Sequence, residues 1–170
     1  MRLRNMGSMT DRDKEALIGR YNSNIRLNGR YYIFFGLWAA VRSFMMLTLD
    51  DSILKEAFAE MEVDEAIRVF VEFFVIVVLI LIMLCILAIH FFVGISAIRY
   101  SRGKSKNRIF LLIAAIDIIV IVLSMPNDFP NGIRASAIAA AMVDITQVIM
   151  LGNMLYSVIR IKSLTQAAKE

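Results

Sequence analysis

The sequence predicts an all-α integral membrane protein, a bundle of four transmembrane helices whose N- and C-termini both lie in the cytoplasm. Two observations predict this class. The 170-residue chain is 59% hydrophobic, which is more than a soluble domain of this length usually carries. Its apolar residues form four long runs, and most of its basic residues stand between or beside those runs. Lipid is therefore the expected solvent.

The four apolar runs cover about residues 31–49, 67–98, 109–125 and 135–159. A helix needs roughly 20 apolar residues to cross a hydrocarbon core of ~30 Å. Lipid admits only helices and closed barrels, and the runs lack the alternation that barrel strands show. We therefore expect four helices, with residues 31–159 as the transmembrane domain.

The segment before the first run is basic and predicts a short amphipathic helix within residues 1–30. Leu17, Tyr21 and Ile25 repeat every four residues, and Thr10 is a residue type that caps helices. Such a helix can lie on the anionic inner leaflet of the bilayer, attracted by its basic groups. The alternative is a solvated segment that leads into the first span.

The placement of basic residues predicts the orientation. Residues 1–30 carry seven basic groups, residues 99–108 carry five, and the tail 160–170 carries three. The two other connections carry one each. Basic residues accumulate on the cytoplasmic side, so we expect a multi-pass plasma-membrane protein with both termini in the cytoplasm. Because topology accounts for these charges and no aromatic platform accompanies them, no nucleic acid is expected as a partner.

The first outer connection is acidic and predicts an amphipathic helix over residues 51–66. The stretch from Asp50 to Glu65, both included, carries seven acids and one lysine. The acids lack the glycine turn and the ordered ligand spacing of a calcium loop. The sequence therefore predicts neither a metal site nor a cofactor, and we interpret the acids as a solvated face.

Ionisable side chains within the spans are the candidate functional residues, because each costs about 2.5 to 3.5 kcal/mol near the centre of a transmembrane helix. They are Arg42, Glu72, His90, Asp117 and Asp144, with Gln147 as a polar neighbour. We expect Arg42 to bridge Asp117 and Asp144 in the bundle core. Glu72 is expected nearer the outer end of the bundle and His90 nearer the inner end.

Helical spacing predicts which face of each span carries these residues. In the fourth span the stripe consists of Ala137, Ala140, Ala141, Asp144, Gln147 and Leu151. In the third it consists of Ala114, Asp117 and Ser124, and in the second of His90, Gly94 and Ala97. Small residues on these stripes favour close helix packing.

Three functional interpretations follow from the charged residues. In the first, the arginine and its acids are a polar lock in a non-enzymatic bundle that associates with a second copy or with another membrane protein. In the second, the same acids and His90 form the path of a small proton- or cation-coupled transporter or channel. The third, an intramembrane aspartate dyad, is disfavoured because an arginine beside two acids favours their charged forms. We therefore expect no enzymatic activity.

Overall fold

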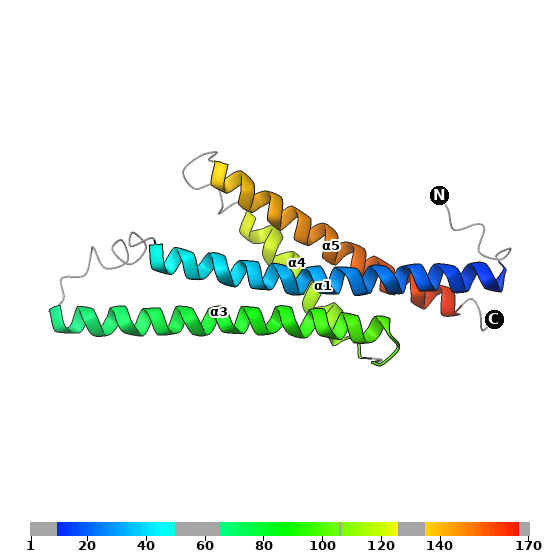
Figure 1. Cartoon of the computed structure of the whole chain (residues 1–170), viewed down its shortest axis with the longest axis horizontal. Helices are drawn as coiled ribbons and strands as arrows, with labels where there is room; N and C mark the ends of the chain where they lie inside the picture. The colour runs from blue at the N-terminus through cyan, green and yellow to red at the C-terminus, as the bar shows by residue number, and fades with distance from the viewer. Residues whose placement is uncertain (1–9, 50–64, 106, 126–134, 167–170) are drawn as a thin grey trace. The chain divides into compact units, whose positions relative to one another are not determined.

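The computed structural model describes residues 10–49, 65–105, 107–125 and 135–166, and the regular elements within them are α-helices. The helices are α1 (Asp11–Leu49), α3 (Glu65–Ser101), α4 (Ile109–Ser124) and α5 (Ala135–Gln166), in the order that Figure 1 shows. The predicted all-α class is confirmed. The acidic helix expected over residues 51–66 lies almost entirely outside the described residues.

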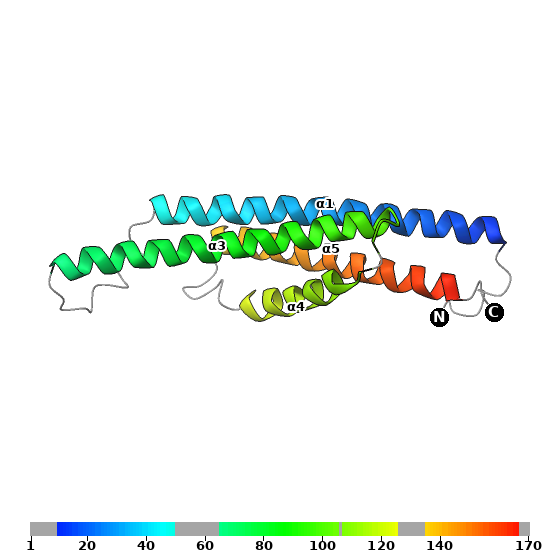
Figure 2. The same cartoon turned by 90° about the horizontal axis from the view of Figure 1, so that it is seen from below.

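The chain forms two compact units. Unit 1 consists of Met1–Ile33 and Phe92–Glu170, and unit 2 consists of Phe34–Phe91. Unit 1 therefore holds the first part of α1, the last part of α3, and all of α4 and α5. Within it α4 packs along α5, as both views of the chain show (Figures 1 and 2).

Helix α1 begins at a capping residue, as the sequence predicts. The backbone N–H of Asp13 donates to the Thr10 hydroxyl at 3.3 Å, and that hydroxyl donates to the Asp13 carboxylate at 2.7 Å. This cap satisfies one of the backbone donors left free at a helix start. The helix then continues unbroken to Leu49, so the expected short basic helix is the first part of a single long helix.

Helices α3 and α4 are joined by a tight turn that a glycine makes possible. Gly103 has φ +69°, a backbone conformation that glycine adopts without steric cost. Its N–H donates to the carbonyl oxygen of Tyr100 at 2.9 Å, and the N–H of Lys104 donates to that of Arg99 at 3.0 Å. These bonds close the last turn of α3. The side chains of Tyr100 and Phe110 then meet across the turn, with ring centroids 5.6 Å apart.

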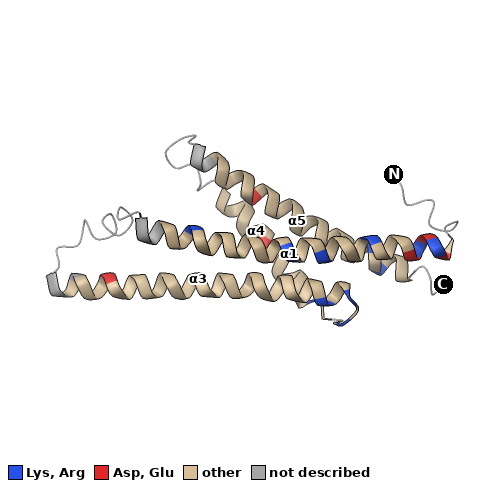
Figure 3. Cartoon of the chain, viewed as in Figure 1, with Lys and Arg blue, Asp and Glu red and all other residues tan. Residues whose placement is uncertain are grey.

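Basic residues gather at one end of unit 1 (Figure 3). The beginning of α1, the turn after α3 and the end of α5 lie toward this end. The described parts of the three basic segments, which are far apart along the chain, therefore lie toward the same end of unit 1. We call this region the basic end of unit 1.

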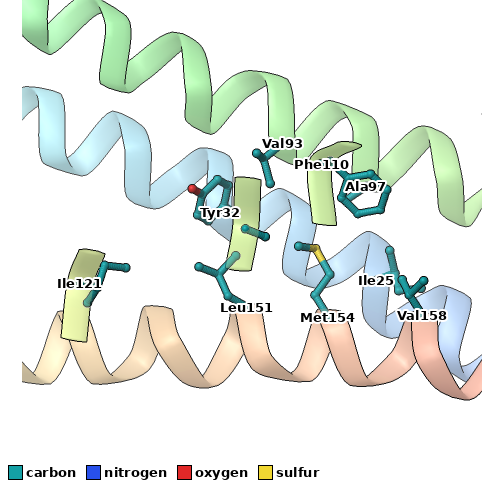
Figure 4. Close-up of a cluster of buried hydrophobic side chains, with 10 residues drawn as sticks. Ile25, Tyr32, Val93, Ala97, Phe110, Ile121, Leu151, Met154 and Val158 are labelled. Atoms are coloured by element: carbon teal, nitrogen blue, oxygen red, sulfur yellow. The ribbon is translucent and has the colours of Figure 1, made fainter. Parts of the chain in front are cut away.

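The core of unit 1 is built from side chains of all four helices (Figure 4). Its fully buried members include Ile25 and Tyr32 from α1, Val93 and Ala97 from α3, Phe110 and Ala114 from α4, and Leu151 and Met154 from α5. On α5 the buried residues Gln147, Leu151, Met154 and Val158 follow one another at spacings of four, three and four residues, which is the seam of a helix packed in a bundle.

Two helical stretches, Val69–Ser101 and Ile138–Gln166, are long and apolar enough to cross a membrane. Helix α4 is apolar but shorter. In the most apolar part of Val69–Ser101 none of the residues is buried within the protein.

Candidate functional site

Asp117 of α4 is the centre of a polar cluster within unit 1. The Tyr32 hydroxyl of α1 donates a hydrogen bond to its Oδ2 atom at 2.7 Å. The Gln147 side-chain amide of α5 donates to the same oxygen at 3.3 Å. One carboxylate oxygen therefore links three helices, and we call Tyr32, Asp117 and Gln147 the Asp117 cluster.

Apolar packing positions each member of the cluster. On α4, Asp117 lies between Ala114 and Ile121, which are both buried, and it shares their face of the helix. On α5, Gln147 is 9% exposed and precedes Leu151, which is 1% exposed, by one turn. Tyr32 is 1% exposed and belongs to the same buried cluster as Leu151 (Figure 4). The polar cluster thus lies against the core of unit 1.

The partners of Asp117 are neutral donors. Among the described residues no cation pairs with its carboxylate, which is itself half-buried. A buried or half-buried charge needs hydrogen bonds or an opposite charge to offset its lost hydration. Here a phenol and an amide supply those bonds, and bonds to an ionised acceptor are stronger than those between neutral groups.

The structure brings together two of the predicted site residues, Asp117 and Gln147. Asp144, half-buried, lies on α5 one turn before Gln147 and in the same unit. Arg42 is exposed and belongs to unit 2, so its predicted bridge to Asp117 and Asp144 stays a prediction.

The other two predicted residues lie on the part of α3 that belongs to unit 2. His90 is 6% exposed, and its Nδ1 atom donates to the carbonyl oxygen of Ile86 at 2.9 Å. A methyl group placed on Gly36 would overlap the His90 ring, so this glycine makes room for the imidazole. Glu72 is half-buried and lies five turns from His90 along the helix, so these two residues do not share a site.

The predicted faces are largely those that the structure buries. On α5 Ala140, Gln147 and Leu151 are buried, and on α3 His90 and Ala97 are buried. Ser124 departs from this pattern, because it is exposed and its hydroxyl donates to the carbonyl oxygen of Ile121 at 2.9 Å. The side chain of Ala137, also predicted on the α5 face, lies outside the described part of the chain.

Sequence reasoning missed Tyr32, although a signal for it was present. The apolar stripe of Leu17, Tyr21 and Ile25 continues at helical spacing to Tyr32, which is two turns after Ile25. A tyrosine on the buried stripe of a helix needs a partner for its hydroxyl group, and a half-buried aspartate supplies one.

The Asp117 cluster links α1, α4 and α5 through one carboxylate that accepts two hydrogen bonds. Within the described residues no group of three His, Cys, Asp or Glu side chains is placed to hold a metal ion. Neither a protein-family model, nor a curated protein, nor a solved structure matches the chain.

Proposed function

We propose that the chain is a non-enzymatic, multi-pass membrane protein that serves as an assembly or accessory subunit, with its helices held in register by the Asp117 cluster. The observation that carries this proposal is the pair of hydrogen bonds from Tyr32 and Gln147 to one oxygen of Asp117. They join helices that are far apart in the sequence, and they require each helix to keep one rotation and one level.

The proposed membrane location is supported by the apolar side chains that the protein exposes. Phe70, Phe73 and Phe74 of α3 are each 60% or more exposed, and so are Leu112 of α4 and Ile149 of α5. A helix from the core of a soluble protein would bury such residues, whereas lipid solvates them. Four spans with both termini in the cytoplasm agree with the basic end of unit 1, since all three basic segments would then face one leaflet.

The Asp117 cluster can fix the helix register because unpaired polar groups are costly in an apolar medium. A half-buried carboxylate without its donors, or a buried amide or phenol without an acceptor, loses its hydration without compensation. Turning α1 or α5 by one residue rotates its side chains by about 100° and would break a bond to Asp117. The cluster therefore selects one helix register, whatever its net contribution to stability.

A second candidate is a small proton- or cation-coupled transporter that uses the same acids. The observation that favours it is the placement of Asp117 and Asp144, both half-buried, on two packed helices of one unit. Gln147 donates a hydrogen bond to Asp117 and lies one turn after Asp144 on α5. Intramembrane acids in such positions are the groups that proton paths use.

Flux and stability measured on the same variants distinguish the two candidates. The purified protein, Asp117→Asn and Asp144→Asn would be reconstituted in liposomes and tested under pH and cation gradients. A lock predicts no flux in the unaltered protein and a lower stability of Asp117→Asn. Flux in the unaltered protein, lost in variants that remain folded, would instead establish transport.

The partner is a second copy of the chain or another membrane protein. Light scattering on the purified protein in detergent gives its mass and separates these cases. A stable dimer or higher oligomer supports self-association. A monomer that co-purifies with a second membrane protein supports the accessory role.

A further inference from the structure

Arg160, near the end of α5, is a cation without a counter-charge in the described part of the chain. Its side chain is partly buried, and its Nε atom is covered by the protein and makes no hydrogen bond. No carboxylate of the described residues pairs with this guanidinium group. A partly desolvated charge of this kind is stabilised when an anion comes to it.

Two tyrosines stand beside the Arg160 guanidinium. Its central carbon lies 5.9 Å from the centroid of the Tyr156 ring. Tyr21 of α1 contacts Tyr156 edge-on, with ring centroids 6.2 Å apart and an interplanar angle of 74°. The ring of Tyr156 attracts the guanidinium of Arg160. The contact with Tyr21 restrains the Tyr156 ring, so the guanidinium is held beside the contact between α1 and α5.

The position of Arg160 along α5 is that of a membrane boundary. Ile159, just before it, is 64% exposed, and Lys162, two residues later, is exposed. Arg160 therefore stands between an exposed apolar residue and an exposed basic one. The end of α5, which carries Arg160, lies toward the basic end of unit 1, to which α1 and the turn after α3 also contribute (Figure 3). Tyrosine is enriched at the headgroup level of membranes.

We propose that Arg160, flanked by Tyr21 and Tyr156, binds the phosphate group of an anionic phospholipid of the inner leaflet. The terminal N–H groups of a guanidinium are planar donors that match phosphate oxygens, and phenol hydroxyls are further donors. A lipid fits better than soluble phosphate, because the exposed apolar surface at Ile159 can contact its acyl chains. The proposal rests on the membrane location of the chain and is independent of the Asp117 cluster.

The test compares the effect of phosphatidylglycerol, phosphatidylcholine and inorganic phosphate on the thermal unfolding of the full chain in detergent. Phosphatidylglycerol should raise the Tm, whereas phosphatidylcholine and inorganic phosphate should not. The Arg160→Gln variant should need about tenfold more phosphatidylglycerol, or more, for the same shift, because a charge-assisted hydrogen bond is lost. The matched control Lys162→Gln removes one charge from the same end and should change this requirement by no more than about fivefold.

A conservative variant and a measurement on the unaltered protein test the proposal further. Arg160→Lys keeps the charge but loses the planar donors, so an intermediate requirement is expected. Native mass spectrometry of the unaltered protein, which needs no variant to fold, should show retained phosphatidylglycerol in preference to phosphatidylcholine. Equal retention of the two lipids, an equal loss in Arg160→Gln and Lys162→Gln, or a Tm shift with inorganic phosphate alone would each overturn the proposal. If the chain proved not to be a membrane protein at all, fractionation would show this separately.

Discussion

At the scale of single residues, Asp117 shows how this protein accommodates a carboxylate among apolar side chains. Its Oδ2 atom accepts from a phenol and from an amide, and the two donors come from different helices. Hydrogen bonds to charged groups contribute about 1.5 to 3 kcal/mol each, which is roughly twice the contribution of neutral ones. The bond from Tyr32 is the shorter of the two, so we expect it to contribute more.

The Tyr32→Phe substitution removes only the hydroxyl oxygen and tests that bond. We expect it to lower the free energy of unfolding by about 1.5 to 3 kcal/mol, because the Asp117 carboxylate loses a donor. Denaturation of the purified protein in mixed micelles, followed by circular dichroism, measures the loss. The matched control is Tyr31→Phe, which makes the same chemical change one residue earlier on α1, at a side chain that is 47% exposed. Equal losses in both variants would show that the hydroxyl of Tyr32 has no special role.

The sequence identified Asp117 and Gln147 as candidates because polar groups within apolar runs are rare and costly. It did not identify Tyr32, because a tyrosine near the start of a span is ordinary and its partner lies 85 residues later. Tyr32 is at the beginning of the apolar run 31–49 and Asp117 is near the middle of the run 109–125, so their places in the runs predict different depths, whereas their side chains are hydrogen-bonded at 2.7 Å. The tilt of a helix and its register against its neighbours change the depth of each residue, and local spacing in the sequence encodes neither.

At the scale of the elements, α1 and α3 approach closely within unit 1 because two glycines face each other. A methyl group placed on Gly29 would lie 2.9 Å from the carbonyl oxygen of Gly94. One placed on Gly94 would lie 2.6 Å from that of Gly29. Side chains at these positions would push the two backbones apart. Small residues at such crossings are typical of helices packed in membranes.

Replacing Gly29 with alanine should therefore weaken the crossing. We expect a loss of about 1 to 3 kcal/mol, the usual cost of forcing a methylene or methyl group into a packed interface. The control is Gly19→Ala in the same helix, where nothing lies within 4 Å of the added methyl group. That change should be neutral or stabilise the helix by up to about 1 kcal/mol. Chemical denaturation of the two variants and the unaltered protein measures the free energy of unfolding. A Gly29→Ala variant as stable as the unaltered protein would contradict the close approach of α1 and α3 at Gly29.

Some helix bounds were accessible from the sequence, because apolar runs and turn residues mark them, whereas α5 continues seven residues beyond the expected end at residue 159. The run expected at 109–125 matches α4 to within one residue, and the run expected from 135 begins where α5 begins. The Thr10 cap was likewise predictable from a local pattern. The continuity of α1 was not, because a polar first half and an apolar second half read as two elements although the backbone makes one helix.

At the scale of the whole molecule, we propose that the exposed apolar surface faces lipid and that the basic end of unit 1 faces the cytoplasm. This predicts the side of the membrane on which each connection lies. Single cysteines introduced at Ser52, Lys104 and Gln166, in a Cys85→Ser background, report those sides. A membrane-impermeant thiol reagent should label the cysteine at position 52 in intact cells and the other two only after permeabilisation.

Labelling of position 104 or 166 from outside would contradict the proposed orientation. Labelling of position 52 only after permeabilisation would show that the connection between the first two runs lies in the cytoplasm, which would contradict the four-span arrangement. The sequence predicts this topology through charge placement alone, and the fold adds that the three basic segments of unit 1 lie toward one end.

The most direct test of the account is a double-mutant cycle between Tyr32 and Asp117. The free energy of unfolding in mixed micelles would be measured for the unaltered protein, Tyr32→Phe, Asp117→Asn and the double variant. If the hydroxyl and the carboxylate hold α1 against α4, the double variant loses less than the sum of the single losses, with a coupling of about 1 to 3 kcal/mol. Additive losses would show that the two side chains do not act together, and the lock at the centre of this account would be wrong.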